Sequence, residues 1–551
     1  MRVPLRLCLT VLTVWPLLAA APAWAALAAP ALEGFGNVHR PVAGAAPQVQ
    51  AWFDQGLRQA YAFDEAEAAR AFKAALQLDP ACAMCAWGVA WQLGPNYNHR
   101  RRGDYAEARR HAVLAQQLLG EGATRLERDL VAALVARYGE AGQASAAQIA
   151  QAEAICGAGK SDGDPLDVIY AQNMRMLADA NPNDPDVQAL FAEAELIAAP
   201  RTGYDPVTLV TSGRMRALFD RLEAALRKHP QHTGLIHYYT HAADTPAEAA
   251  RAAPAAALLA RLAPDASHLV HMPSHLAMRL GRYADAVRAN QQALDAQRRL
   301  SATLEKQGFT LLTDWNAHNR RFLWIAAQIQ GDRATAMAQA RQLADSAGNR
   351  GDDWSQFLRA MPLLTMVHFG QWDDILYTGK ADTLAPHLLA YARALARIRK
   401  GLAVEAEVQQ LELHLAQAAA QGADAKAGAA FATMLLAQVK ADQALARSDT
   451  ASARAELRKA LAAEADFPAQ EPPLWADSAQ RNLGNVLLRA RDFSAAESAF
   501  RADLKQLPNN VWALKGLHQA LQGQGKKSQA AQVRKAWRTS ATNADPALRP
   551  S

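Results

Sequence analysis

The chain has 551 residues, of which 50% are hydrophobic and 20% are charged, and its formal net charge is +6 at pH 7. This composition favours a large helical globular protein and argues against a disordered chain. Because the basic excess is small for this length and is scattered among acidic residues, we expect no nucleic-acid partner.

The first 25 residues have the pattern of a cleavable signal peptide. Arg2 and Arg6 precede an apolar run that is too short to span a bilayer, and the small residues Ala23 and Ala25 follow it. We therefore predict cleavage after Ala25, which lowers the net charge from +6 to +4. No later apolar stretch is long and uncharged enough to cross a membrane. The mature protein is expected in the periplasm or outside the cell.

Two segments near the ends of the chain share one spacing of small, aromatic and proline residues. The first segment carries it at Trp52, Gly56, Ala68, Phe72, Ala75 and Pro80, and the second at Leu483, Gly484, Ala496, Phe500 and Pro508. This spacing resembles the tetratricopeptide repeat (TPR) family, whose unit is a helix pair of about 34 residues. The resemblance implies that small residues let the helices of a pair approach closely while the aromatic rings fill the space between pairs.

Further units are indicated between these ends by a glycine that is followed five residues later by an alanine. This turn pattern occurs at Gly103, Gly281, Gly331 and Gly401, and more loosely at Gly370. We predict an all-α, right-handed α-solenoid of TPR-like helix pairs with almost no sheet. Its N-terminal repeats are expected in residues 26–120, degenerate helical repeats in 121–230, central repeats in 231–420 and C-terminal repeats in 421–545, with a bend near Gly422.

Histidines concentrate in the central repeats. In the TPR family the second, fifth and ninth residues of the first helix usually line a concave groove. Counting back from Gly281 starts such a helix near Ser267, and counting back from Pro264 starts the preceding one near Thr233. Six of the fifteen histidines are then expected on one groove wall, namely His237, His241, His268, His271, His275 and His318.

The chemistry of this cluster points to a transition metal. Residues three, four or seven apart on a helix share a face, and neighbouring helices pack about 8–10 Å apart, so imidazoles of adjacent units can meet at one ion. Imidazole suits zinc and copper, and Asp244 or Asp314 could complete the shell. Two alternatives remain open, acid–base catalysis near neutral pH and ordinary hydrogen-bonded histidines. Pro273 either kinks the helix or begins a new one, in which case His268 lies in a loop.

A cysteine pair and several polar residues complete the set of candidates. Cys82 and Cys85 open a helix, where they could form a disulfide, a redox pair or a soft-metal site. They do not form a haem site, since Ala86 stands where that motif requires histidine. The segment 157–161 lacks the first glycine of a phosphate loop, so no nucleotide is expected. Polar groove contacts are predicted at Asp244, Asn96, Asn98 and Asn319.

The motifs "CAMCAWG", "HYYTH", "HLVHMPSH" and "HNRRFL" together resemble a group of exported bacterial TPR proteins, and this resemblance implies no activity. The favoured hypothesis is a solenoid that binds a protein or peptide partner or supports assembly, with zinc or copper in its groove. The alternative is a metal-dependent hydrolytic or oxidative enzyme that uses the six histidines as ligands or acid–base groups. The chain lacks the common zinc-protease and serine-hydrolase signatures, so an enzyme is the less favoured hypothesis.

Overall fold

The structure is a computed structural model, and it describes residues 29–98, 105–139, 143–156, 164–199, 203–205, 208–378, 384–420, 426–466, 472–473 and 476–550. The predicted signal peptide, the turn glycine Gly103, the segment 157–161 and the predicted bend at Gly422 lie outside these residues.

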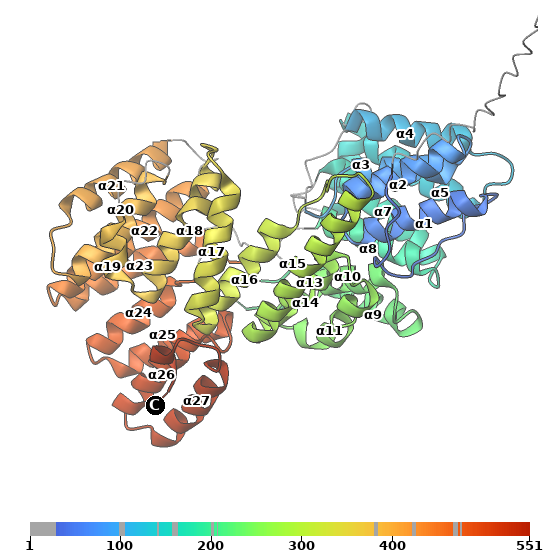
Figure 1. The fold of residues 1–551 in the computed structure, drawn as a ribbon. Coiled ribbons are helices and arrows are strands. Elements are labelled where there is room, and N and C mark those ends of the chain that lie inside the picture. Colours follow the sequence, from blue (N-terminus) through green and yellow to red (C-terminus); the bar gives the residue numbers. More distant parts are fainter. Residues whose placement is uncertain are drawn as a thin grey trace, which may run out of the picture.

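The N-terminal half of the chain folds into one lobe of helices (Figure 1). Polar caps begin several of them: the Thr124 side chain accepts from the backbone N–H of Glu127, and the Glu127 carboxylate reaches back to the Thr124 N–H. The helices of this lobe are α1 (Pro47–Tyr61), α2 (Glu65–Leu78), α3 (Ala83–Leu93), α4 (Tyr105–Leu118), α5 (Arg125–Tyr138), α6 (Ala146–Cys156), α7 (Pro165–Ala180), α8 (Pro185–Ala198), α9 (Gly213–Lys228), α10 (Thr233–Ala242), α11 (Ala249–Ala256), α12 (Leu259–Leu262), α13 (Ser267–His271), α14 (Pro273–Arg279) and α15 (Tyr283–Lys306).

The C-terminal half forms a second lobe, which α15 and the next helix join to the first (Figure 1). Its elements are α16 (Asn316–Gln330), α17 (Arg333–Ala347), α18 (Asp353–Phe369), α19 (Trp372–Tyr377), α20 (Pro386–Arg399), α21 (Glu405–Ala420), α22 (Lys426–Ala446), α23 (Thr450–Asp466), α24 (Ala479–Arg489), α25 (Phe493–Gln506), α26 (Val511–Gly523), α27 (Lys527–Ser540) and the short 3₁₀ helix η2 (Pro546–Leu548). Within the described residues there is no β-strand, and Tyr204 and Thr211 form an isolated bridge. The predicted all-α solenoid of TPR-like helix pairs is confirmed.

The packing between helices is that of the repeat. A Cβ added to Gly56 on α1 would lie 2.8 Å from the ring of Phe72, and one added to Gly88 on α3 would lie 2.5 Å from the same ring. The ring of Phe500 fills the corresponding space between Gly484 and Gly516 in the C-terminal lobe. Each ring therefore occupies room that only glycine leaves open, which explains why the spacing recurs at both ends of the chain.

Each lobe also closes on itself. The first helix α1 packs against α10, where a Cβ added to Gly234 would lie 2.7 Å from the ring of Tyr61. In the second lobe the end of the chain returns to the C-terminal end of α16. There the backbone N–H of Asp545 donates to the carbonyl of Gly331, the residue after α16, at 2.8 Å. The indole of Trp512 likewise donates to the Gln328 carbonyl at 2.9 Å. Closure of the N-terminal lobe determines the surroundings of the histidines.

Candidate functional site

The six histidines come from the first helices of three successive helix pairs. Helix α10 carries His237 and His241, α13 and α14 carry the next three, and α16 carries His318. The predicted helix starts at Thr233 and Ser267 are those of α10 and α13. Pro273 is the first residue of α14, where its missing N–H costs little, and His268 lies in α13 rather than in a loop.

The histidines lie inside the lobe, where they are buried rather than exposed on the predicted groove wall. The five histidines of α10, α13 and α14 are at most 8% exposed, and His318 is half-buried. The physical reason is the closure of the lobe, since α1 and the turn after it cover α10. The Nδ1 atom of His237 lies 2.6 Å from the carbonyl oxygen of Tyr61, a residue 176 positions earlier.

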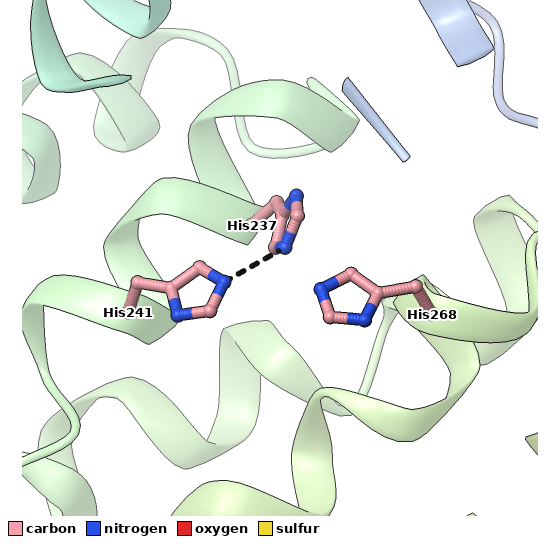
Figure 2. Close-up of side chains that lie close together, drawn as sticks. All are labelled: His237, His241 and His268. Carbon is pink, nitrogen blue, oxygen red and sulfur yellow. Dashed lines mark hydrogen bonds between the residues drawn. The ribbon is translucent and has the colours of Figure 1, made fainter. Parts of the chain in front are cut away.

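Three imidazoles form a first group, composed of His237, His241 and His268 (Figure 2). One ring nitrogen of each lies within 4.8 Å of the others, and the Nε2 atoms of His237 and His241 are 3.1 Å apart. Because the Tyr61 carbonyl can only accept, His237 donates from Nδ1 and its Nε2 atom carries a lone pair directed at the group.

A second group of three contains His268, His271 and His318, with ligand atoms again within 4.8 Å of one another. The Nε2 atom of His271 lies 3.1 Å from that of His318 and 2.9 Å from that of His275. His275, which was predicted with these residues, is not a member of either group of three. It contacts the second group through His271.

Hydrogen bonds determine the tautomers of His271 and His275. The Nδ1 atom of His271 lies 2.6 Å from Oδ1 of Asn290, whose own amide nitrogen donates to the Ala286 carbonyl. The Nδ1 atom of His275 lies 3.0 Å from a carboxylate oxygen of Asp244. Both acceptors require an N–H at Nδ1, so in the neutral rings both Nε2 atoms carry lone pairs. These two lone pairs face each other across 2.9 Å.

Burial keeps the imidazoles uncharged. Burial is the largest cause of a pKa of about 3 for His237 and for His318, and the neighbouring His275 contributes to lowering both values. The pKa values of His241, His268 and His271 lie well below the ordinary value for the same two reasons. Neutral imidazole is the form that binds metal ions, so no proton has to leave before these rings can act as ligands.

Aromatic rings that the sequence reasoning missed surround the cluster. Trp315 stacks on one side of His268 with ring centres 4.1 Å apart, and Phe63 stacks on it at 5.1 Å. Tyr97 lies 4.4 Å from His241, and Phe322 lies 4.5 Å from both His271 and His275, measured between ring centres. These rings pack against the imidazoles and restrict their rotation.

Phe63 occupies its place at a conformational cost. It has φ +56° in the turn between α1 and α2, a left-handed conformation that is unfavourable for a bulky residue. The turns of later pairs use glycine for the same conformation, as at Gly281, Gly331 and Gly401. The five-residue spacing from Phe63 to Ala68 matches that from Gly281 to Ala286, and this register could have identified Phe63 from the sequence.

The residues predicted as polar groove contacts differ in where they lie relative to the histidine cluster. Asp244 accepts from His275 and, at 2.8 Å, from Arg279, so it supports a histidine rather than facing the cluster. Asn319 donates to the Ser267 hydroxyl at 3.0 Å and is buried. Asn96 accepts from the backbone of Asn98 at 3.0 Å in the loop that presents Tyr97. Asp314 is exposed and accepts from the backbone of the next helix, so it takes no part in the cluster.

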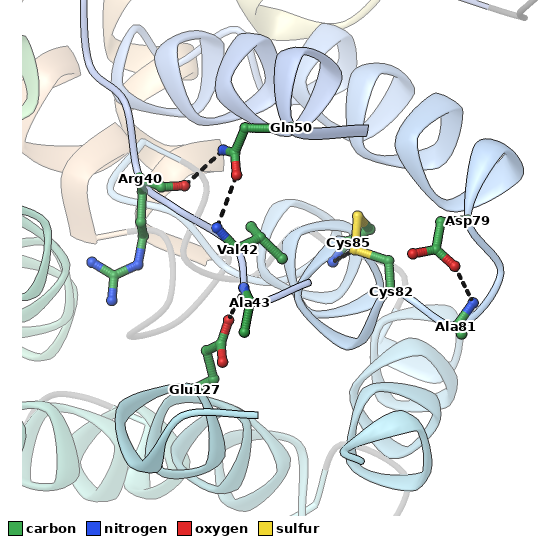
Figure 3. The surroundings of a disulfide bond; sticks show 9 residues. All are labelled: Arg40, Val42, Ala43, Gln50, Asp79, Ala81, Cys82, Cys85 and Glu127. Atoms are coloured by element: carbon green, nitrogen blue, oxygen red, sulfur yellow. Dashed lines mark hydrogen bonds between the residues drawn. A yellow bond between two sulfur atoms is a disulfide. The ribbon is translucent and has the colours of Figure 1, made fainter. Parts of the chain in front are cut away.

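The two cysteines form a disulfide at the start of α3 (Figure 3). Cys82 is the N-cap residue of that helix, and its sulfur accepts from the backbone N–H of Cys85 at 3.1 Å. Both residues are buried among the helices of the N-terminal lobe. As a disulfide the pair offers no thiolate to a metal ion. Of the disulfide, the redox pair and the soft-metal site considered from the sequence, the structure shows the disulfide.

An open groove lies in the C-terminal lobe instead, and it escaped the sequence reasoning. It has a volume of about 490 Å³ and is lined by the first helices of successive pairs, α18, α20, α22, α24 and α26. Its charged and aromatic lining includes Trp372, Tyr391, Arg399, Asp442, Arg481 and Trp512. The run Asn482, Asn485 and Arg489 on α24, at spacings of three and four, was the available signal for a polar helix face.

One cation in this groove is incompletely paired. Arg399 bonds Asp442 at 2.7 Å, whereas the buried Nη1 atom of Arg481 has no hydrogen-bond partner in the described part of the chain. Burial lowers the pKa of Arg481. Arg481 also pairs with Asp477, so the groove combines aromatic surface with a buried, incompletely paired cation.

The sequence matches no protein-family model and no curated protein sequence. Three solved structures show the range of similarity. The human IFIT1 dimer with m7Gppp-AAAA is 13% identical with a TM-score of 0.32, covering 90% of each chain. Yeast Tom70 is 11% identical with a TM-score of 0.26, covering 91% of this chain and 93% of that one. The P58(IPK) TPR domain is 10% identical with a TM-score of 0.21, covering 87% and 99%. Similarity this low gives no basis for assigning the ligands or partners of these proteins to this chain.

In the described part of the chain, no helix combines the length and apolar character that crossing a membrane requires.

Proposed function

We propose that this protein is an exported helical-repeat binding protein that holds a transition-metal ion in its buried histidine cluster. The observation that carries the proposal is the pair His271 and His275. Their Nε2 lone pairs face each other at 2.9 Å, while both Nδ1 atoms donate to oxygen acceptors. Two lone pairs at this distance repel each other unless a cation lies between them.

Two cations can fill this role, a proton or a metal ion. A shared proton would place a charged imidazolium in an interior that lowers the pKa of His271 well below its ordinary value. A metal ion avoids that cost because it coordinates neutral rings. With metal–nitrogen bonds of about 2.0–2.1 Å, nitrogens 2.9 Å apart subtend about 90° at the ion, an angle found in ordinary coordination shells.

The acceptors behind the rings have the arrangement of a metal site. Histidine ligands commonly donate their second N–H to a carboxylate or a carbonyl, which fixes the ring and makes it a stronger donor to the metal. Here the Tyr61 carbonyl, the Asn290 amide oxygen and the Asp244 carboxylate supply these acceptors to three rings. An all-imidazole shell suits zinc or copper.

The fold supports a binding role for the whole protein. The metal links α10, α13, α14 and α16 and so stabilises the first lobe, while the groove of the second lobe receives a protein or peptide partner. Trp372 and Trp512 line that groove with apolar surface, and Arg399 and Asp442 line it with charged groups. Enclosure of the histidines by Phe63, Tyr97 and Trp315 favours holding an ion over turning over a large substrate. The signal-like N-terminus supports export to the periplasm or the medium.

The experiment is elemental analysis of the mature protein, purified without a histidine tag and dialysed after reconstitution with zinc or copper. We expect stoichiometric metal in the wild type and in His111→Ala, a control on α4 whose ring bonds a backbone carbonyl of its own helix. We expect strong loss when His237 and His271 are both replaced by alanine, because this removes one ligand from each group of three. Folded protein without metal in every sample would contradict the metal proposal.

A further inference from the structure

We propose that His268 bridges two metal ions through its two ring nitrogens, so that the cluster is a dinuclear centre. This inference rests on the proposed function. One ion would be held by His237 and His241, and the other by His271 and His318 together with His275, whose Nε2 atom lies 2.9 Å from that of His271.

The first observation is that the two groups of histidines share one member. His268 belongs to both sets of three, and the other members of the sets are different residues on different helices. Each group brings its own pair of further ligands, His237 with His241 and His271 with His318. A residue common to two sites is the natural bridge between them.

The second observation is that both nitrogens of His268 are buried and lack a partner. The residue is 1% exposed, and neither Nδ1 nor Nε2 has a hydrogen bond in the described part of the chain. A neutral imidazole carries one N–H and one lone pair, and leaving either unpaired inside a protein is unfavourable because neither recovers the hydrogen bond it made with water. Among the six histidines, His268 is the one whose two ring nitrogens both lack a hydrogen bond within the described residues. Two metal bonds would satisfy both atoms.

The orientation of the ring fits a bridge. Trp315 and Phe63 stack on His268 with interplanar angles of 29° and 23°, so the nitrogens are left at the ring edge. Figure 2 shows one nitrogen of His268 directed at His237 and His241 and the other directed away from them. The ring centres of His271 and His318 lie 5.7 Å and 5.9 Å from that of His268.

The chemistry balances without an oxidant or a reductant. Coordination by one nitrogen uses the lone pair of neutral His268, and coordination by the second requires loss of its remaining N–H proton to water. The ring then becomes a bridging imidazolate, whose negative charge offsets part of the charge of the two cations. The carboxylate of Asp244 behind His275 offsets another part.

The test is a titration of the full mature protein, without a tag, with copper(II), followed by elemental analysis and electron paramagnetic resonance. We expect two copper ions per chain and a spin signal well below two per chain, since imidazolate couples two copper(II) ions antiferromagnetically. His268→Gln is expected to bind at most one ion and to show its full spin signal. His318→Gln, which leaves the first group intact, is expected to bind one ion and serves as the second variant if His268→Gln does not fold.

The other outcomes are separable. One copper per chain in the wild type would overturn the bridge and leave the proposed metal function standing. Two copper ions with the full signal of two independent spins would also overturn it. No bound copper in folded wild-type protein would overturn the proposed function itself.

Discussion

His271 and His275 point their Nε2 atoms at each other across 2.9 Å, and each donates its Nδ1 proton to an oxygen on a different helix or loop. One turn of helix separates the two residues, so their backbone holds the pair together. The acceptors Asn290 and Asp244 hold the ring orientations. An arrangement of this kind is stable with a cation between the rings and strained without one.

The Asp244 carboxylate should strengthen metal binding without touching the ion. Replacing it by alanine removes the acceptor behind His275 and releases Arg279, so we expect affinity to fall by about 10- to 100-fold. Competition with a chromogenic chelator measures the change. Asp314→Ala is the matched control, because that exposed carboxylate bonds only backbone in the described structure, and its affinity should stay at the wild-type value. Equal losses in both variants would refute this role of Asp244.

At Phe63, substitution by glycine should destabilise the protein less than substitution by alanine. Both substitutions remove the ring that packs on His237 and His268, which costs several kcal/mol of unfolding free energy. Glycine tolerates φ +56°, whereas alanine does not, so Phe63→Gly should be more stable than Phe63→Ala by about 1 kcal/mol. Urea unfolding of the two variants gives the difference. Alanine equal to or better than glycine would mean that the turn is not strained.

The contact of α1 with α10 should depend on Gly234. A Cβ there would lie 2.7 Å from the Tyr61 ring, so Gly234→Ala must move α1 away from α10 and should destabilise the protein by about 1–3 kcal/mol. Hydrogen exchange in α10 should rise with it, because α1 covers that helix. Gly213→Ala is the control, since nothing lies within 4 Å of its added Cβ. A Gly234→Ala variant as stable as this control would argue against the closed lobe.

Glu193 should make stability fall as pH rises. Burial raises its pKa from 4.5 to about 7, and it accepts from the Trp91 indole at 2.7 Å. The folded state therefore binds a proton that the unfolded state has released, and this contribution is lost between about pH 4.5 and pH 7 with a slope of at most about 1.4 kcal/mol per pH unit. Glu193→Gln keeps an acceptor for Trp91 and should remove the slope. Parallel stability curves for the two proteins would contradict the raised pKa.

The sequence predicted the parts of the site that depend on local register. The turn glycines and Pro264 were enough to predict helix starts at Thr233 and Ser267, and so to place the histidines of three pairs on one side of the solenoid. Their burial depends on a contact between His237 and Tyr61, 176 residues apart, which no local pattern contains. The open groove on α24 and its neighbours was missed for a similar reason, since its lining is shared among six helices, α18, α19, α20, α22, α24 and α26.

The most direct test of the metal centre is X-ray absorption at the metal edge of the reconstituted, tag-free protein. We predict a first shell of nitrogen at about 2.0–2.1 Å with the multiple scattering of imidazole, and loss of this shell when His237 and His271 are both replaced by alanine. A first shell composed of oxygen alone, unchanged in this double variant, would show that the bound metal lies elsewhere and would contradict the account.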